Sequence, residues 1–427
     1  MKRGTLAAAL SALFMVSTCY SAIAQNRQAL KEPKTTTVDQ FYTILNRSGY
    51  WYGTDNNDAV LRTSILHIAD NARYYGLRKE DYNFPKETGS SLSGDQLTRA
   101  ELQFTRALID FSKDIYKGAA INKYIRNDEI SHLFKAKTDS FILSWLTGID
   151  GNTDLNAHFA LLEPRDGSYA ILKEGLKRQV DSGNNKKIAE LTEGINLRRW
   201  INHFHFDKYI MVNIPAARLY LYDHDQLTLT MKVVAGKPST RTPRFSTWCN
   251  KVILYPYWNV PSSIARKELV PRFKKSPAKV AAMNMQILNS KGKIVDPYSL
   301  NWSSFSRSYF PYTIMQCTGC DNSLGVIKFN LTDPFDVYMH DTNYKLAFGS
   351  DRRFLSHGCI RVSQPIELGN NLLDSKLDSN FLKACIKGQD PVTIDLKTPV
   401  PVFVVYMTAD TDSNSVKYYK DIYRLNN

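Results

Sequence analysis

Apolar residues recur at helical spacing through the first half of the chain. Between Thr36 and about Trp200 they form stripes three or four positions apart, of which two are clear: Leu61, Ile65, Ile68 and Ala72 before Gly76, then Leu97, Phe104, Leu108, Phe111 and Ile115 before Gly118. This spacing puts apolar side chains on one face of a helix, and a glycine after each stripe marks its end. The pattern predicts a helical domain over residues 38–200, and we assign no chemistry to these core positions.

The period changes to alternation near residue 205. Leu227, Leu229, Met231 and Val233 occupy every second position after a turn at 223–225, and short apolar runs follow at 252–254, 326–329, 392–396 and 402–406. Short strands at close spacing predict a mainly antiparallel sandwich or barrel. A long mixed stretch, 265–315, predicts a lid-like insertion. We therefore expect an α+β chain whose helical domain precedes a mainly β domain over 205–427.

The first residues have the pattern of a targeting signal. Lys2 and Arg3 are followed by the apolar run Thr5–Val16 and by the small residues Ala22–Ala24. The pattern predicts a signal peptide over 1–24, cleaved near Ala24, and then a polar, flexible segment over 25–37. The run is too short for a comfortable membrane span, so we expect an exported, periplasmic protein without a stable span. An uncleaved anchor, or a lipoprotein through Cys19, remains an alternative.

Composition is that of a globular protein, with 43% hydrophobic and 22% charged residues. The formal net charge of +14 becomes +12 once Lys2 and Arg3 are removed. Because the protein is expected to be exported, we do not expect its positive charge to bind nucleic acid. Because acids are interspersed with the lysines and arginines, we expect a solvated surface with some attraction to an anionic wall.

Cysteines are few. The predicted mature chain keeps Cys249, Cys317, Cys320, Cys359 and Cys385. An odd number in an oxidising compartment leaves one thiol unpaired, by accident or for chemistry. Cys317 and Cys320 have the CxxC spacing of redox and zinc sites, but they lie in a loop of the predicted sheet domain. We therefore predict a loop disulfide there, or two free thiols.

The most informative residues are His340 and the block Ser356-His357-Gly358-Cys359, with Arg361 shortly after it. A thiol attacks a carbonyl as the thiolate, which a histidine can supply by accepting the proton or by forming an ion pair. Gly358 allows close approach of backbone to substrate. The amides around Gly358 and Cys359 are candidate donors to a developing oxyanion.

Other interpretations of these residues stay open at this point. Cys359 is a candidate for a buried structural cysteine or for a disulfide with Cys385. His340, His357 and Cys359 have the side chains that zinc prefers, although a fourth ligand is not evident. Nucleophilic chemistry is the favoured hypothesis, and it requires no metal or cofactor.

The spacing of His340 from Ser356-His357-Gly358-Cys359, with Arg361 after it, resembles the active-site signature of YkuD-type L,D-transpeptidases. Flanking segments are similar to the larger YcbB-like branch of that family: 195–200, 209–215, 236–238, 241–243, 257–261, Gln316, Gly319 and 322–325. The resemblance covers about residue 195 to the C-terminus and is weaker in the helical region.

The resemblance implies roles for these residues. Cys359 would attack a tetrapeptide stem before its terminal D-alanine and pass the acyl group to the side-chain amine of a diamino acid, giving 3–3 cross-links. His340 would be the base, and four residues would shape the pocket: Ser356, His357, Gly358 and Arg361. Tyr338 and Trp258 are weaker candidates for substrate contact. Carbapenems are the expected covalent inhibitors.

One departure from the branch concerns substrate capture. Residues 179–193 are too few for the peptidoglycan-binding module common in YcbB-like enzymes, so capture would depend on the two domains and the positive charge. Two other functions stay open. Water in place of the amine would give an L,D-carboxypeptidase or endopeptidase, and a structural Cys359 would leave a non-catalytic scaffold that binds the wall.

Overall fold

The computed structural model describes residues 36–47, 49–53, 56–86, 92, 94–412 and 414–426. The predicted signal peptide and most of the predicted flexible segment lie outside these residues. Helix α2 (Thr37–Leu45) begins at a capping box, in which the Thr36 side chain accepts from the Asp39 amide and the Asp39 carboxylate accepts from the Thr36 amide. Gly49–Asn427 form a separate compact unit, to which the remaining elements belong.

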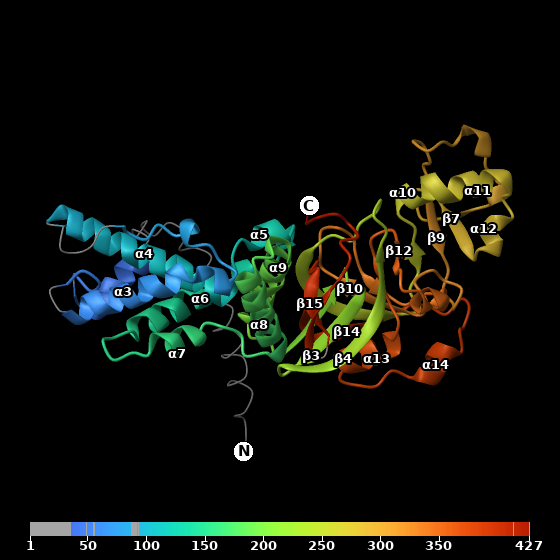
Figure 1. Ribbon diagram of the computed structural model, residues 1–427. Coiled ribbons are helices and arrows are strands. Elements are labelled where there is room, and N and C mark those ends of the chain that lie inside the picture. Colours follow the sequence, from blue (N-terminus) through green and yellow to red (C-terminus); the bar gives the residue numbers. More distant parts are fainter. Residues whose placement is uncertain are drawn as a thin grey trace, which may run out of the picture. The chain divides into compact units, whose positions relative to one another are not determined.

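Helices fill the first part of this larger unit (Figure 1). They are α3 (Asn56–Asp70), α4 (Asp95–Lys117), α5 (Ile121–Tyr124), α6 (Ser131–Thr147), α7 (Leu155–Ala160), α8 (Gly167–Ser182) and α9 (Asn185–Asn202). Both predicted stripes are confirmed: one runs through α3 into a 3-10 turn that ends at Gly76, and the other is α4. None of the helices in the described ranges is long and apolar enough to cross a membrane.

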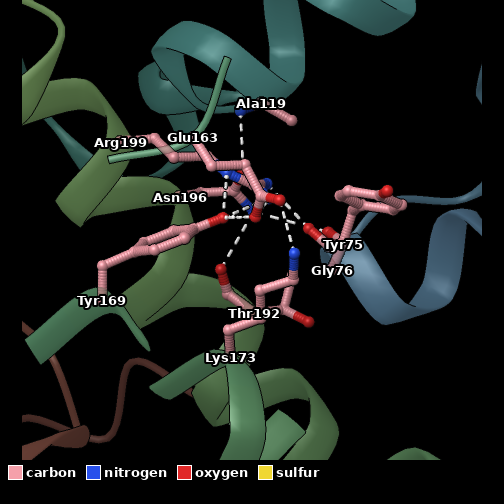
Figure 2. A network of polar contacts seen from close by, with 9 residues as sticks. All are labelled: Tyr75, Gly76, Ala119, Glu163, Tyr169, Lys173, Thr192, Asn196 and Arg199. Carbon is pink, nitrogen blue, oxygen red and sulfur yellow. Dashed lines mark hydrogen bonds and ion pairs between the residues drawn. The ribbon is translucent and has the colours of Figure 1, made fainter. Parts of the chain in front are cut away.

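A polar network built on Arg199 lies among these helices (Figure 2). The guanidinium is fully buried and donates to the carbonyl oxygen of Tyr75 and to the hydroxyl of Tyr169, both at 2.7 Å. The Glu163 carboxylate lies 3.8 Å from it and also accepts from Tyr169 and Lys173. A buried charge without partners costs several kcal/mol, so these contacts are what permit an arginine in this core.

Helix α9 connects the helical region to the strands. Arg198, also buried, pairs with Asp410 at 2.6 Å, and Asp410 accepts a second hydrogen bond from Asn213 at 3.0 Å. Trp200 donates to Asp128 at 3.2 Å. Consecutive residues of α9 therefore bond to both the helical region and the barrel region.

The following strands close into a barrel. They are β2 (Lys208–Asn213), β3 (Arg218–Asp223), β4 (Gln226–Gly236), β5 (Phe245–Leu254), β10 (Ile327–Leu331), β11 (Met339–His340), β13 (Ile360–Val362) and β14 (Val392–Val405). The order β5-β10-β11-β13-β4-β3-β2-β14 returns to β5, because β14 pairs with both β2 and β5. Most pairs are antiparallel, whereas β11–β13 and β2–β14 are parallel. The predicted fold class, helices followed by a sandwich or barrel, is confirmed.

Shorter elements complete this region. Strand β12 (Phe354–Ser356) pairs with β4, β1 (Asn127–Asp128) of the helical region pairs with β5, and β15 (Ala409–Asp412) pairs with β16 (Ser415–Tyr418). Helices α13 (Pro365–Leu372) and α14 (Ser379–Lys383) precede β14. The barrel interior is filled by inward-facing apolar residues such as Ile210, Val233 and Val402, all completely buried.

An insertion with its own apolar core separates β5 from β10. It contains the sheet β6-β9-β7-β8, formed by Trp258–Asn259, Thr313–Gln316, Met285–Leu288 and Ile294–Val295. The helical part, α10 (Ser262–Ile264), a π-helical turn (Ala265–Leu269), α11 (Val270–Lys275) and α12 (Lys279–Ala282), packs on it. Pro271 has no N–H for the carbonyl of Lys267, which favours the wider turn. The insertion thus begins before the predicted residue 265.

The cysteine prediction was wrong. Cys320 forms a disulfide with Cys385, while Cys317 is free. The partner lies 65 positions along the chain, and the fold after α14 brings the two Cα atoms to 5.0 Å. Cys359 is also free, which removes the alternative of a Cys359–Cys385 bond.

Candidate active site

Two short parallel strands bring the candidate catalytic residues together. His340 in β11 pairs with Arg361 in β13, and Met339 pairs with Ile360. Cys359 immediately precedes β13, where the Ile360 amide donates to the Tyr338 carbonyl at 3.0 Å. The strand pairing therefore places the thiol and the imidazole on neighbouring backbones.

The His340 side chain is buried and uncharged. Its Nδ1 lies 2.5 Å from the carbonyl oxygen of Asp341, and because a carbonyl only accepts, Nδ1 carries the proton. Nε2 is then left with a free lone pair. Burial, followed by the positive charges of Arg361 and Lys328, lowers the pKa of His340 to about 3. The imidazole is therefore uncharged near neutral pH, with Nε2 unprotonated.

The Cys359 thiol is partly exposed, with Sγ 3.9 Å from the carbonyl oxygen of Asp336. Burial raises the pKa of this thiol, and hydrogen bonds from the backbone and hydroxyl of Tyr338, together with the charge of Lys328, act in the opposite direction. A protonated thiol beside a neutral imidazole is suited to general-base activation, in which the proton moves as the sulfur attacks.

Two cations adjoin this thiol. Lys328 in β10 pairs with His340 across the sheet, and its Nζ lies 4.2 Å from the ring centroid of Tyr338. Arg361 interacts electrostatically with Cys359, and its buried Nε has no hydrogen-bond partner in the described part of the chain. Both charges favour the thiolate.

Replacing Lys328 with methionine should make the thiolate harder to form, because a positive charge that lowers the pKa of Cys359 is removed. We expect the pH midpoint of Cys359 alkylation by iodoacetamide to move upward. The rate at pH 7 should fall several-fold, while the high-pH plateau stays unchanged. Lys328→Arg, which keeps the charge, should retain the native midpoint. An unchanged midpoint in Lys328→Met would contradict the electrostatic role.

The turn before Cys359 is held by side chains. Ser356 Oγ accepts from the Gly358 amide at 3.1 Å and donates to the Cys359 carbonyl at 2.6 Å. Thr242 Oγ1 donates to the Gly358 carbonyl at 2.7 Å, and Gly358 has φ +128°, which favours glycine. Since Ser356 engages the Gly358 amide, the Cys359 amide, which has no acceptor among the described residues, is the better placed of the two for an oxyanion.

The insertion reaches this turn from two sides. Glu268, in the π-helical turn, lies 2.6 Å from Nε2 of His357. Trp258, in β6, interacts with the side chain of Tyr338, which itself adjoins the Cys359 thiol. Single π turns occur often at functional sites. The insertion is therefore part of the site's wall rather than a remote appendage.

Several supporting residues were not predicted from the sequence: Lys328, Thr242, Glu268 and Asp341. Asp341 is buried, accepts from the Val326 amide at 3.1 Å and pairs with Lys345. Gly325 leaves room for its carboxylate, since a Cβ there would collide with it. The segment 322–325 of the family resemblance thus supports the residue that follows His340.

The zinc alternative requires three or four ligands in one place. Among the residues that the structure describes, no three His, Cys, Asp or Glu side chains are grouped to hold a metal, and this includes His340, His357 and Cys359. His357 instead faces Glu268.

Comparison with known proteins adds family evidence. Residues 207–402 match the model of the YkuD L,D-transpeptidase catalytic domain, and residues 36–176 match the Scaffold domain. A Haemophilus influenzae protein whose name assigns it to the L,D-transpeptidases is 30% identical over 284 residues, or 66% of this chain and 57% of that protein. The chain thus spans somewhat over half the length of that relative.

Solved structures show more distant similarity. An L,D-transpeptidase from Mycobacterium smegmatis is 14% identical, covering 46% of this chain and 58% of that one, with a TM-score of 0.22. An L,D-transpeptidase in complex with imipenem is 16% identical, covering 47% and 59%, with a TM-score of 0.21.

Proposed function

Because this chain belongs by its catalytic domain to the YkuD-type L,D-transpeptidases, we propose that it cross-links peptidoglycan in the periplasm through a thioester on Cys359. The donor is a tetrapeptide stem, the acceptor is the side-chain amine of a diamino acid on a second stem, and the product is a 3–3 cross-link. One observation carries the proposal: β11 and β13 pair so that a neutral imidazole, His340, lies in the strand beside the free thiol.

The first half of the reaction forms the thioester. As Sγ of Cys359 attacks the carbonyl carbon before the terminal D-alanine, Nε2 of His340 takes the thiol proton. The Cys359 amide donates to the oxygen that gains charge. His340 then passes the proton to the nitrogen of D-alanine, the C–N bond breaks, and D-alanine leaves.

The second half reverses these roles. The acceptor amine attacks the thioester carbonyl and His340 takes a proton from that amine. As the C–S bond breaks, His340 gives this proton to the sulfur, which restores the thiol. Both steps need a base that is uncharged when each nucleophile arrives, which the lowered pKa of His340 supports. Arg361, whose charge acts on Cys359, and Ser356 and Gly358, which shape the turn, position the acyl group.

Mass spectrometry of the products tests this function directly. We would incubate the mature protein with disaccharide-tetrapeptide muropeptides. A dimer lacking one D-alanine supports transpeptidation. Tripeptide without dimer would show an L,D-carboxypeptidase, and cleavage of preformed 3–3 dimers would show an endopeptidase. If no substrate is converted, the remaining function is a non-catalytic scaffold that binds the wall. We also expect a carbapenem such as imipenem to add covalently to Cys359, as family membership suggests.

Removing Glu268 should lower turnover of the large peptide substrate more than it lowers the reactivity of the Cys359 thiol. Glu268 reaches the turn through His357, and both side chains are partly exposed, so the expected effect is modest. For Glu268→Ala we expect about a threefold loss in kcat/KM for tetrapeptide, with unchanged alkylation by iodoacetamide. Glu268→Gln keeps a hydrogen-bonding group and should recover part of the loss.

Lys267→Ala, on the same turn but exposed and outside this contact, is the matched control. Equal losses in Glu268→Ala and Lys267→Ala would show that the turn matters only as a whole. Native kcat/KM in Glu268→Ala would show that the contact with His357 has no role in turnover.

A further inference from the structure

A cavity of about 660 Å³ lies among α4, α5, α6 and α9, beside strand β1. We call it the basic cavity. None of its lining residues belongs to the proposed reaction site. Because β1 pairs with β5, the cavity lies where the helical region contacts the barrel. Ligand sites are commonly roughly 300–1,000 Å³ in volume and often occur where domains meet.

Three positive side chains line the basic cavity without a direct salt bridge, and Lys117 interacts electrostatically with Asp110 and Asp114 of its own helix. They are Lys117, which is partly buried, and Arg126 and Lys135, which are exposed. None of the three forms an ion pair with another residue in the described ranges. Cations gathered in one concave site attract an anion more strongly than the same charges dispersed over a surface.

The acids in the lining cancel these charges only in part. Asp139 is already paired with Lys113 at 2.6 Å. Asp128 accepts from Ser246 at 2.7 Å and from Trp200 at 3.2 Å, so its oxygens are engaged in holding the domains together. Asp128 keeps its negative charge and offsets one of the three cations, so the charged side chains of the lining still sum to a net positive charge of two.

The lining also has an apolar part. Ile121, Ile125 and Trp200 belong to both the lining and an apolar cluster between the helices and the barrel. Trp200 is held by its indole N–H bonds to Asp128 and Ser131, so this surface is preformed. A ligand that matches the site therefore combines several negative charges with short aliphatic groups.

We propose that the basic cavity binds an acidic peptide of the cell wall, and so holds the protein on its polymeric substrate. Carboxylates pair with Lys117, Arg126 and Lys135, where the planar guanidinium of Arg126 suits a bidentate carboxylate contact. Alanine-like side chains lie on Ile121 and Ile125. The proposal rests on the proposed function, which supplies the wall as substrate, and it provides wall binding where residues 179–193 leave no room for a binding module.

Co-sedimentation with purified sacculi tests the site. The mature protein carrying Cys359→Ala, which prevents acylation, is compared with the same protein carrying Lys117→Gln, Arg126→Gln and Lys135→Gln. The control carries Arg165→Gln, Lys186→Gln and Lys397→Gln, three exposed residues outside the cavity that remove the same charge. Equal melting temperatures show that each variant is folded. We expect the cavity variant to bind about tenfold more weakly and the control to bind almost normally.

A second arm identifies the chemistry recognised. Sacculi whose carboxylates have been converted to amides should lose binding to the unsubstituted cavity. Native binding to amidated sacculi would overturn a carboxylate ligand. Equal weakening in the cavity and control variants would overturn a defined site in favour of dispersed charge, and unchanged binding in the cavity variant would overturn the proposal outright.

Failure of this inference is distinguishable from failure of the proposed function. Proteins that keep Cys359 are assayed on soluble muropeptides, for which wall anchoring is not needed. The cavity variant should retain turnover there while losing binding to sacculi. If no variant turns over muropeptide, the proposed reaction fails, whereas the sedimentation results still decide whether the cavity binds the wall.

Discussion

Cys359→Ala should abolish both release of D-alanine and formation of dimers from tetrapeptide muropeptides. The thiol is the atom that forms the thioester, so its removal leaves no route to an acyl-enzyme. Loss of a catalytic nucleophile typically lowers turnover by about 10⁴-fold or more. Product formation is followed by liquid chromatography and mass spectrometry.

Cys317→Ala is the matched control for this prediction, because Cys317 is also a free and partly exposed thiol. It should retain turnover. Turnover that survives in Cys359→Ala, or that is lost equally in Cys317→Ala, would show that Cys359 is not the nucleophile.

His340→Gln should lower tetrapeptide turnover by about 10²–10⁴-fold, the usual contribution of a general base. Glutamine is similar in size and can still donate to the Asp341 carbonyl, but it cannot accept the thiol proton. Because the pKa of His340 is lowered to about 3, this substitution removes no charge at pH 7. The pH profile of Cys359 alkylation should therefore stay close to native while turnover collapses.

The same variant separates two ways of activating the thiol. If His340 were instead a charged partner in a resting ion pair, its removal would raise the pKa of Cys359 and move the alkylation profile strongly upward. His357→Gln, which changes an imidazole outside the β11–β13 pairing, is the control and should lose much less turnover.

The arrangement of the fold was predictable where local patterns decide it. Alternation in 227–233 and the turn at 223–225 reflect one hairpin, whose strands β3 and β4 pair as expected. Closure of the barrel was not predictable in this way, because β14 pairs with both β2 and β5, which lie far from it in the sequence. A strand's pattern indicates which face is buried but not which strands become its neighbours.

In the candidate site, too, some residues could be predicted from local sequence patterns and others depend on contacts between distant segments. His340 and Cys359 were predicted because their residue types and spacing fit nucleophilic chemistry, and the fold places them on neighbouring stretches of backbone. Lys328 and Glu268 belong to segments with no motif of their own, and their roles arise only from packing against Tyr338 and His357. The Cys320 disulfide was missed for a related reason, since its partner is chosen by the position of the chain after α14.

The central claim, that Cys359 carries the acyl group, is tested most directly by intact-protein mass spectrometry during turnover of a tetrapeptide without an acceptor amine. We predict an added mass equal to the stem peptide minus D-alanine, which peptide mapping assigns to Cys359. Turnover of the tetrapeptide with no such adduct, or an adduct on another residue, would contradict the account.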